Sequence, residues 1–77
     1  MNMNNNKTNT IDLMDVFGCN LKRTMKEKNY TIEKLAEDLD VSPRVVYDWI
    51  SGLKFPRFER AIHISYILKV SLDSLVR

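Results

Sequence analysis

The stretch from Leu35 to Gly52 constrains the fold most strongly, because it predicts two short helices joined by a tight turn. Leu35, Ala36 and Leu39 recur at i, i+1 and i+4, so they lie on one face of the first helix. Asp40 then interrupts the apolar pattern, and Asp is one of the few residues besides Gly that tolerate a left-handed backbone. We therefore expect the first helix to end at Asp40 and the chain to turn there.

A second helix is predicted to begin at Pro43. Ser42 can cap it by accepting from its free amides, and a proline suits the first helical position, where the missing N–H costs nothing. Val46, Trp49 and Ile50 repeat at i, i+3 and i+4 and form the face that packs on the core. The side chains predicted to point away from the core are Arg44, Tyr47, Asp48 and Ser51.

Three more helices are predicted around this pair. One runs from about Asp12 to Lys28, and its inner stripe consists of Val16 or Phe17, Leu21 and Met25. Another runs from about Arg57 to Lys69 and is expected to bury Phe58, Ala61, Ile62, Ser65 and Leu68. The last is short, from Leu72 to Val76. Without a strand pattern or an internal repeat, the fold class is all-α with one domain.

Residues 1–10 differ in composition from the rest, because they are rich in Asn and offer almost nothing to bury. We interpret them as a disordered N-terminal arm and residues 11–77 as the folded domain. An arm that enters a DNA minor groove is the functional alternative. Lys7 is its single basic residue, which favours plain disorder.

Length and composition agree with a small helical domain. Seventy-seven residues support one modest core, and 44% apolar residues with only two Gly and two Pro favour helices over disorder. One cysteine cannot form an internal disulfide, which favours a reducing cytoplasm. No apolar run approaches about 18 residues and no signal core precedes the domain, so we expect no membrane association.

Catalysis and metal binding find little support in the residue types. His63 is the single histidine, and Cys19 has no His or Asp within local reach to activate it. One Cys and one His do not make a metal-ligand set. We therefore expect no enzyme activity, no catalytic residue, no metal and no cofactor.

The charges are distributed unevenly, although the net charge of +2 is too small to argue for nucleic acid by itself. Residues 22–28 hold four basic side chains against one acidic, and residues 43–60 hold four against two. Residues 31–41 hold four acidic side chains against one basic. A basic rim thus flanks the helix that starts at Pro43, unless these runs are merely solvated helix faces.

Many positions match, in order and spacing, the anchors of a known family. They are Phe17, Gly18, Leu21, Leu35, Ala36, Val41, Ser42, Trp49, Gly52, Pro56, Leu68, Val70 and the run Ser71 to Leu75. On these anchors, residues 16–76 resemble the Cro and phage-repressor-type (XRE-like) helix-turn-helix family. The resemblance implies a compact five-helix, lambda-repressor-like domain with its helix-turn-helix in helices two and three. It also implies a bacterial or phage transcription regulator, typically a repressor, that binds double-stranded DNA.

The chain departs from the family pattern at three places. Ile32 stands where a polar residue, commonly glutamine, begins helix two and contacts DNA in many relatives. Asp40 and Lys69 occupy positions that are often glycine. Met25 and Ile50 stand where many relatives carry an arginine–glutamate salt bridge, and a hydrophobic pair can replace a buried ion pair without loss of stability.

By this resemblance, the helix starting at Pro43 lies in the major groove with its first residues nearest the bases. Arg44 is the main candidate reader, because a guanidinium can donate two hydrogen bonds to guanine. Asp48 could accept a hydrogen bond from a cytosine amine. Because its charge also repels nearby phosphates, we expect it to act mostly as a filter against wrong sequences. The base-reading candidates are Pro43, Arg44, Tyr47 and Asp48, and the phosphate-binding candidates are Thr31, Ser42, Lys54, Arg57 and Arg60.

Two questions stay open at the level of sequence. The outward face, with Ile32, Pro43, Tyr47 and Asp48, would also suit a module that binds another protein, such as a repressor it antagonises, instead of DNA. Family members usually bind as homodimers, assembled in solution or only on DNA. Tyr66, Ile67, Leu72 and Val76 could form the dimer or partner surface, or they could instead complete the core of a small domain.

Overall fold

The computed structural model describes residues 12–77, so the predicted arm over residues 1–10 lies outside the described residues. Within the described part, the chain forms five helices and no strand: α2 (Leu13–Glu27), α3 (Ile32–Leu39), α4 (Pro43–Ile50), α5 (Phe58–Leu68) and α6 (Leu72–Val76). The all-α prediction is confirmed, and each predicted helix lies within one or two residues of its expected ends.

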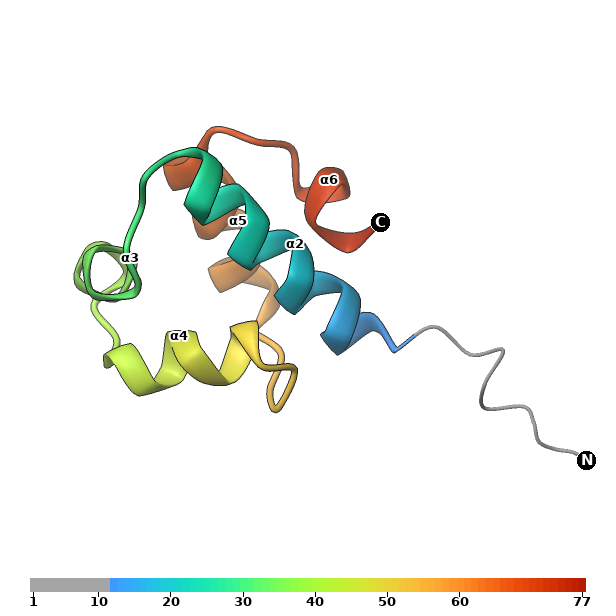
Figure 1. Ribbon diagram of the computed structural model, residues 1–77, viewed down its shortest axis with the longest axis horizontal. Helices are drawn as coiled ribbons and strands as arrows, with labels where there is room; N and C mark the ends of the chain where they lie inside the picture. Colours follow the sequence, from blue (N-terminus) through green and yellow to red (C-terminus); the bar gives the residue numbers. More distant parts are fainter. Residues whose placement is uncertain (1–11) are drawn as a thin grey trace, which may run out of the picture.

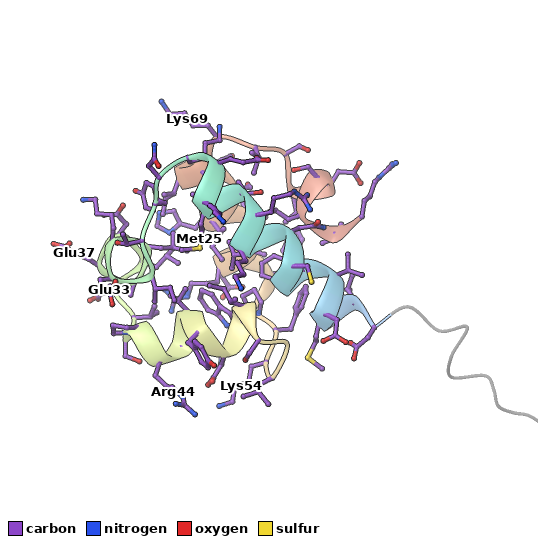
Figure 2. All side chains as sticks on the ribbon, viewed as in Figure 1. Met25, Glu33, Glu37, Arg44, Lys54 and Lys69 are labelled. Carbon is purple, nitrogen blue, oxygen red and sulfur yellow. The ribbon has the colours of Figure 1, made fainter. Side chains whose placement is uncertain are left out.

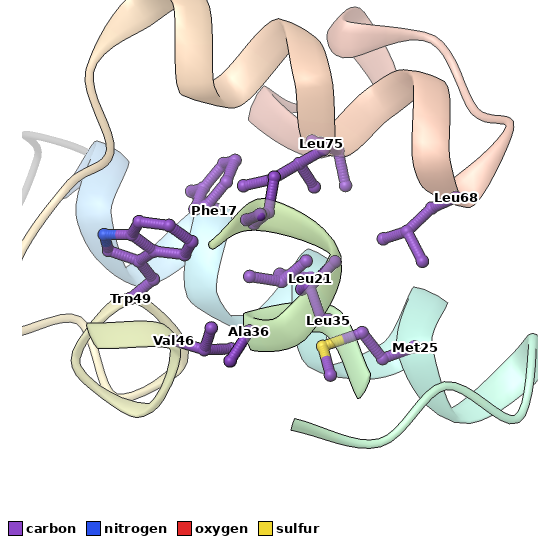
Figure 3. Close-up of a cluster of buried hydrophobic side chains, with 11 residues drawn as sticks. Phe17, Leu21, Met25, Leu35, Ala36, Val46, Trp49, Leu68 and Leu75 are labelled. Atoms are coloured by element: carbon purple, nitrogen blue, oxygen red, sulfur yellow. The ribbon is translucent and has the colours of Figure 1, made fainter. Parts of the chain in front are cut away.

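The longest helix, α2, organises the others. It packs against α4 on one side and α6 on the other, while α3 packs on α4 and α5 (Figure 1). The side chains of Phe17 and Leu21 from α2 meet those of Leu35, Val46 and Leu75 from three other helices (Figure 3). One face of α4 therefore packs on this core, and the opposite face of the helix is exposed to solvent.

Capping residues explain where the helices begin. The side-chain oxygens of Asp12, Thr31, Ser42 and Ser71 each accept from a backbone N–H in the first turn of the helix that follows. Asp40 ends α3 in the left-handed conformation, with φ 58° and ψ 46°, as the sequence predicts. These local signals fix the short turn between α3 and α4.

A glycine sets the distance between α2 and α4. A Cβ atom added at Gly18 would lie 2.5 Å from the carbonyl oxygen of Ile50 and 2.7 Å from that of Trp49. Real Cβ atoms do not approach backbone oxygen so closely. The absence of a side chain at Gly18 thus lets the last turn of α4 rest directly on α2.

The C-terminal helix is tied to α2 by a buried polar contact that the sequence pattern did not reveal. The Asn20 side-chain amide donates to the carbonyl oxygen of Leu75 over 2.9 Å. The Asn20 residue is only 7% exposed, so this bond satisfies an amide that water could not easily reach. It connects residues 55 positions apart in the chain.

The buried face of α5 differs from the sequence prediction. Phe58 is 70% exposed, although it was expected in the core, and Ile64 is fully buried. Apolar residues occur on several sides of this helix, so a period of 3.6 does not select one face. Ala61, Ser65 and Leu68 are buried as predicted, and Ile62 is half-buried.

Candidate nucleic-acid interface

The outer face of α4 presents the residues predicted to read bases. Val46 and Trp49 anchor the helix in the core, and this orientation leaves Pro43, Arg44 and Tyr47 exposed. Arg44 and Lys54 project from the same side of the molecule, away from α2 (Figure 2). The first turn of α4 and the loop after it therefore share one surface.

The predicted outward orientation of Asp48 is wrong. The residue is only 8% exposed, and its Oδ1 has no hydrogen-bond partner among the described residues. The turn after α4 folds back on the end of the helix, where the backbone amides of Leu53 and Lys54 donate to the backbone carbonyl oxygen of Asp48 over 2.9 and 3.2 Å. Helical periodicity cannot anticipate such a returning loop.

Arg44 and Asp48 form an ion pair along α4. The Arg44 Nε lies 3.3 Å from Asp48 Oδ1, which is close enough for charge attraction although the geometry is not that of a hydrogen bond. The guanidinium also lies 5.7 Å from the centre of the Tyr47 ring. Since the Arg44 side chain is 75% exposed, these contacts orient it without hiding it.

The phosphate-binding candidates divide into caps, free cations and one structural residue. The hydroxyl oxygens of Thr31 and Ser42 accept from Lys34 and Val45 amides, so each hydroxyl proton is available to a ligand. Lys54 and Arg57 are exposed, and neither forms an ion pair with any residue of 12–77.

Arg60 is engaged inside the protein. Its Nη1 donates to the carbonyl oxygen of Leu39 over 2.7 Å, and the side chain is half-buried. This bond satisfies one of the free carbonyls at the end of α3 and ties α3 to α5. Arg60 also lines a small hollow of about 190 Å³ together with Arg57, Glu59 and His63. The structure thus assigns Arg60 a packing role that its sequence position did not suggest.

The acidic residues of α3 lie apart from the cations of the α4 surface. Glu33 and Glu37 project from α3 on a different side from Arg44 and Lys54 (Figure 2). Asp38 is held by the Tyr30 hydroxyl, which donates to its Oδ2, and by Lys34 at 3.5 Å. The Tyr30 hydrogen bond, with a smaller contribution from Lys34, lowers the pKa of the Asp38 carboxyl below its ordinary value.

The predicted dimer or partner surface is only partly exposed. Tyr66 is 76% exposed, whereas Ile67 and Val76 are half-buried and pack against the core, and Leu72 is half-buried. Other exposed large apolar side chains lie in and after the α4–α5 loop, where Leu53 is 63% and Phe58 70% exposed. The exposure of Phe58 differs from the sequence pattern, which predicts this residue in the core.

Residues 12–77 contain no group of three or more His, Cys, Asp or Glu side chains arranged to hold a metal ion. Over the same residues, no helix combines the length and the apolar character that a membrane span requires.

Comparison with known proteins agrees with this architecture. A family model described as helix-turn-helix matches residues 21–75, which include α3 and α4. The chain belongs to the helix-turn-helix family. In helix-turn-helix terms, α3 and α4 form the bihelical unit, and α4 takes the place of the recognition helix.

A similar protein comes from Bacillus subtilis (strain 168), where it is named the uncharacterized HTH-type transcriptional regulator YqaE. The two sequences are 34% identical over 62 residues, which cover 80% of this chain and 53% of the relative. The helix-turn-helix chain thus spans about half the length of this relative. No solved structure gives a significant match.

Proposed function

We propose that this helix-turn-helix protein binds double-stranded DNA sequence-specifically and acts as a repressor, with α4 in the major groove. The observation that supports this most is the exposed first turn of α4, where Arg44 projects on the same side of the molecule as the free cation Lys54 (Figure 2). A buried helix face on one side and a cationic, donor-bearing face on the other suit groove insertion. We place this regulator in the cytoplasm of a bacterium or in a phage-infected cell.

Arg44 is the proposed base reader, and Asp48 sets the condition under which it reads. The guanidinium can donate two hydrogen bonds to the O6 and N7 of guanine. When Arg44 does so, it leaves the mostly buried Asp48 carboxylate without its ion-pair partner, which is costly. Moving Arg44 away from Asp48 is therefore favourable only where the base offers two good acceptors. This increases the difference in affinity between guanine and the other bases.

Contacts to phosphate would come from the helix starts and from the loop after α4. The capping residues Thr31 and Ser42 place hydroxyls at the positive ends of α3 and α4, where anions are stabilised. Lys54 and Arg57 supply free charge. These contacts determine position and salt dependence and do not select a sequence.

A symmetric homodimer, formed in solution or on DNA, would place two copies of α4 about 34 Å apart, one turn of B-DNA. The operator would then be an inverted repeat whose half-sites have matching spacing. Exposed apolar side chains at Tyr66, or at Leu53 and Phe58, offer surfaces for such an interface.

Selection from random DNA duplexes with purified protein, followed by titration of single-base variants, tests this proposal. Arg44→Ala is expected to cost about 1–3 kcal/mol on the best sequence and to relax preference at one base position. Lys54→Ala is expected to weaken all sequences alike and to reduce the slope of log affinity against log salt by about 0.9.

Arg23→Ala serves as the control, because Arg23 is an exposed cation of α2 and is none of the candidate contacts. A flat salt dependence, or no duplex selected over background, would reject DNA as the ligand. If Arg44→Ala and Lys54→Ala both weaken binding to all sequences alike, the role of Arg44 in reading a base is rejected, whereas DNA binding itself is not.

A second candidate is a helix-turn-helix module that binds another protein instead of DNA. Two observations favour it: Asp48 is buried and paired, so α4 exposes one strong DNA-reading side chain, and Ile32 adds an apolar surface at the start of α3. Binding of a protein segment with no measurable duplex affinity would distinguish this candidate from the first.

A further inference from the structure

A groove with mostly apolar walls lies beside the outer face of α4. Its volume is about 360 Å³, and three helices contribute to it. The residues that line it are Lys22, Met25, Lys26, Tyr30, Ile32, Tyr47 and Ile50. Met25 is buried at 4% exposure, whereas the other six residues are half-buried or exposed. The groove is therefore an open feature of the surface.

The apolar character of the groove arises from the departures noted in the sequence. Met25 and Ile50 occupy a pair of positions that are charged in many relatives, and Ile32 occupies one that is commonly polar. In the structure, these three side chains meet in one place. Figure 2 shows Met25 between α2, α3 and α4, turned toward the gap that they enclose.

The rim of the groove carries positive charge. Lys22 and Lys26 lie one helical turn apart on α2, both are exposed, and neither forms an ion pair with any residue in 12–77. None of the residues that line the groove is acidic. A ligand that fits here therefore combines an apolar group with nearby carboxylates.

DNA does not explain this groove. A phosphodiester seated over Met25, Ile32 and Ile50 would lose hydration and find no donor on these three side chains, because the donors of the lining belong to Lys22, Lys26, Tyr30 and Tyr47. A free small molecule would also remain largely in water, since small-ligand sites usually enclose most of their ligand. A side chain carried by a second protein fits better, because the partner's own surface then covers the open side.

We propose that this groove docks a segment of a partner protein that presents one large apolar side chain flanked by carboxylates, which pair with Lys22 and Lys26. An amphipathic helix in a groove is one geometry of this kind. Tyr47 lines the groove and also belongs to the outer face of α4, so a docked segment hinders access of α4 to DNA. This competition, unlike the docking itself, rests on the proposed DNA binding.

The test begins with phage-displayed random twelve-residue peptides, selected on the whole protein, and the enriched peptides are then synthesised. We expect a consensus of one Leu, Phe or Trp with Asp or Glu near it. Amide chemical-shift changes are expected to centre on Met25, Ile32 and Ile50. Lys22→Glu with Lys26→Glu is expected to weaken peptide binding by at least about fivefold.

Matched controls separate the groove from general charge. Arg23→Glu with Lys28→Glu changes the net charge equally in the same segment of the sequence, but these residues do not line the groove. The affinity for the peptide should therefore be unchanged. Ile32→Asp is expected to weaken the peptide about tenfold, whereas Leu53→Asp, on an exposed apolar residue elsewhere, should not. Circular dichroism confirms that each variant is folded.

Other outcomes overturn the proposal. These are enriched peptides without acidic residues, shift changes outside the groove, and equal losses in the two charge-reversal pairs. If Lys22→Glu with Lys26→Glu abolishes self-association in sedimentation, the occupant is a second copy of this chain. If that variant weakens only duplex binding and no peptide is enriched, the groove belongs to the DNA surface. Peptide and duplex affinities are measured separately, so failure of DNA binding is distinguished from failure of docking.

Discussion

Replacing Gly18 by alanine tests whether α4 is held on α2 by direct backbone contact. The added Cβ would lie 2.5 Å from the Ile50 carbonyl oxygen, where real contacts stay beyond 3.0 Å. The two helices must therefore separate by about half an ångström or more. The Trp49 carbonyl, at 2.7 Å, also accepts from the Gly52 amide, so the movement disturbs the turn that ends α4.

The expected magnitude combines two opposing effects. Alanine is a better helix former than glycine by about 1 kcal/mol in a helix interior, so Gly18→Ala would stabilise an unconstrained α2. Overpacking against a backbone that cannot yield costs typically about 1–3 kcal/mol. Because the obstructing atoms are backbone, we expect the steric cost to exceed the gain, with a net loss of up to about 2 kcal/mol in the free energy of unfolding.

Urea unfolding followed by circular dichroism measures this change, with the m-value as a check that the unfolded reference is the same. The melting temperature should fall by several degrees, about 4–8 °C per kcal/mol for a domain of this size. Cys19→Ala is the control, because Cys19 is the exposed neighbour on the same helix. A Gly18→Ala protein that is more stable than the parent would refute the close approach of α2 and α4.

Two further predictions follow from polar contacts. Asn20→Leu removes the donor to the buried Leu75 carbonyl, and we expect a loss of about 1–3 kcal/mol in urea unfolding, together with faster amide exchange in α6. Tyr30→Phe removes the hydrogen bond that lowers the pKa of Asp38. Since that pKa is lower in the folded state, the hydrogen bond stabilises the folded protein at pH values above the ordinary Asp pKa. This stabilisation is lost as the pH falls through the folded-state pKa of Asp38. The stability difference between parent and Tyr30→Phe should therefore shrink in acid, and a pH-independent difference would contradict this linkage.

Much of the helix-turn-helix could be predicted because its signals are local. The helix starts are defined by the capping side chains of Thr31 and Ser42 and by Pro43, whose missing backbone N–H costs nothing at the first helical position. The end of α3 is defined by Asp40, which tolerates the left-handed conformation. The apolar spacing of Leu35 with its neighbours assigns the buried face. Such effects depend on residues within one or two helical turns.

The candidate site was harder to predict, since exposure depends on what the rest of the chain places nearby. Asp48 was expected to face solvent, but it is buried in the packed domain. Arg60 stays a candidate phosphate contact, and its guanidinium also reaches the end of α3, where it donates to the Leu39 carbonyl oxygen. The Arg60 contact joins α3 to α5, two segments that sequence periodicity treats separately.

By itself the sequence determined the number of helices, their ends and the presence of a helix-turn-helix, because caps, turn residues and 3.6-residue periodicity act over short range. Tertiary structure alone decided which face of α5 is buried, how Gly18 seats α4, and that Asp48 is buried. It also brought Met25, Ile32 and Ile50 from three helices into one groove. These features depend on close packing between distant segments, and packing is decided by the whole core at once.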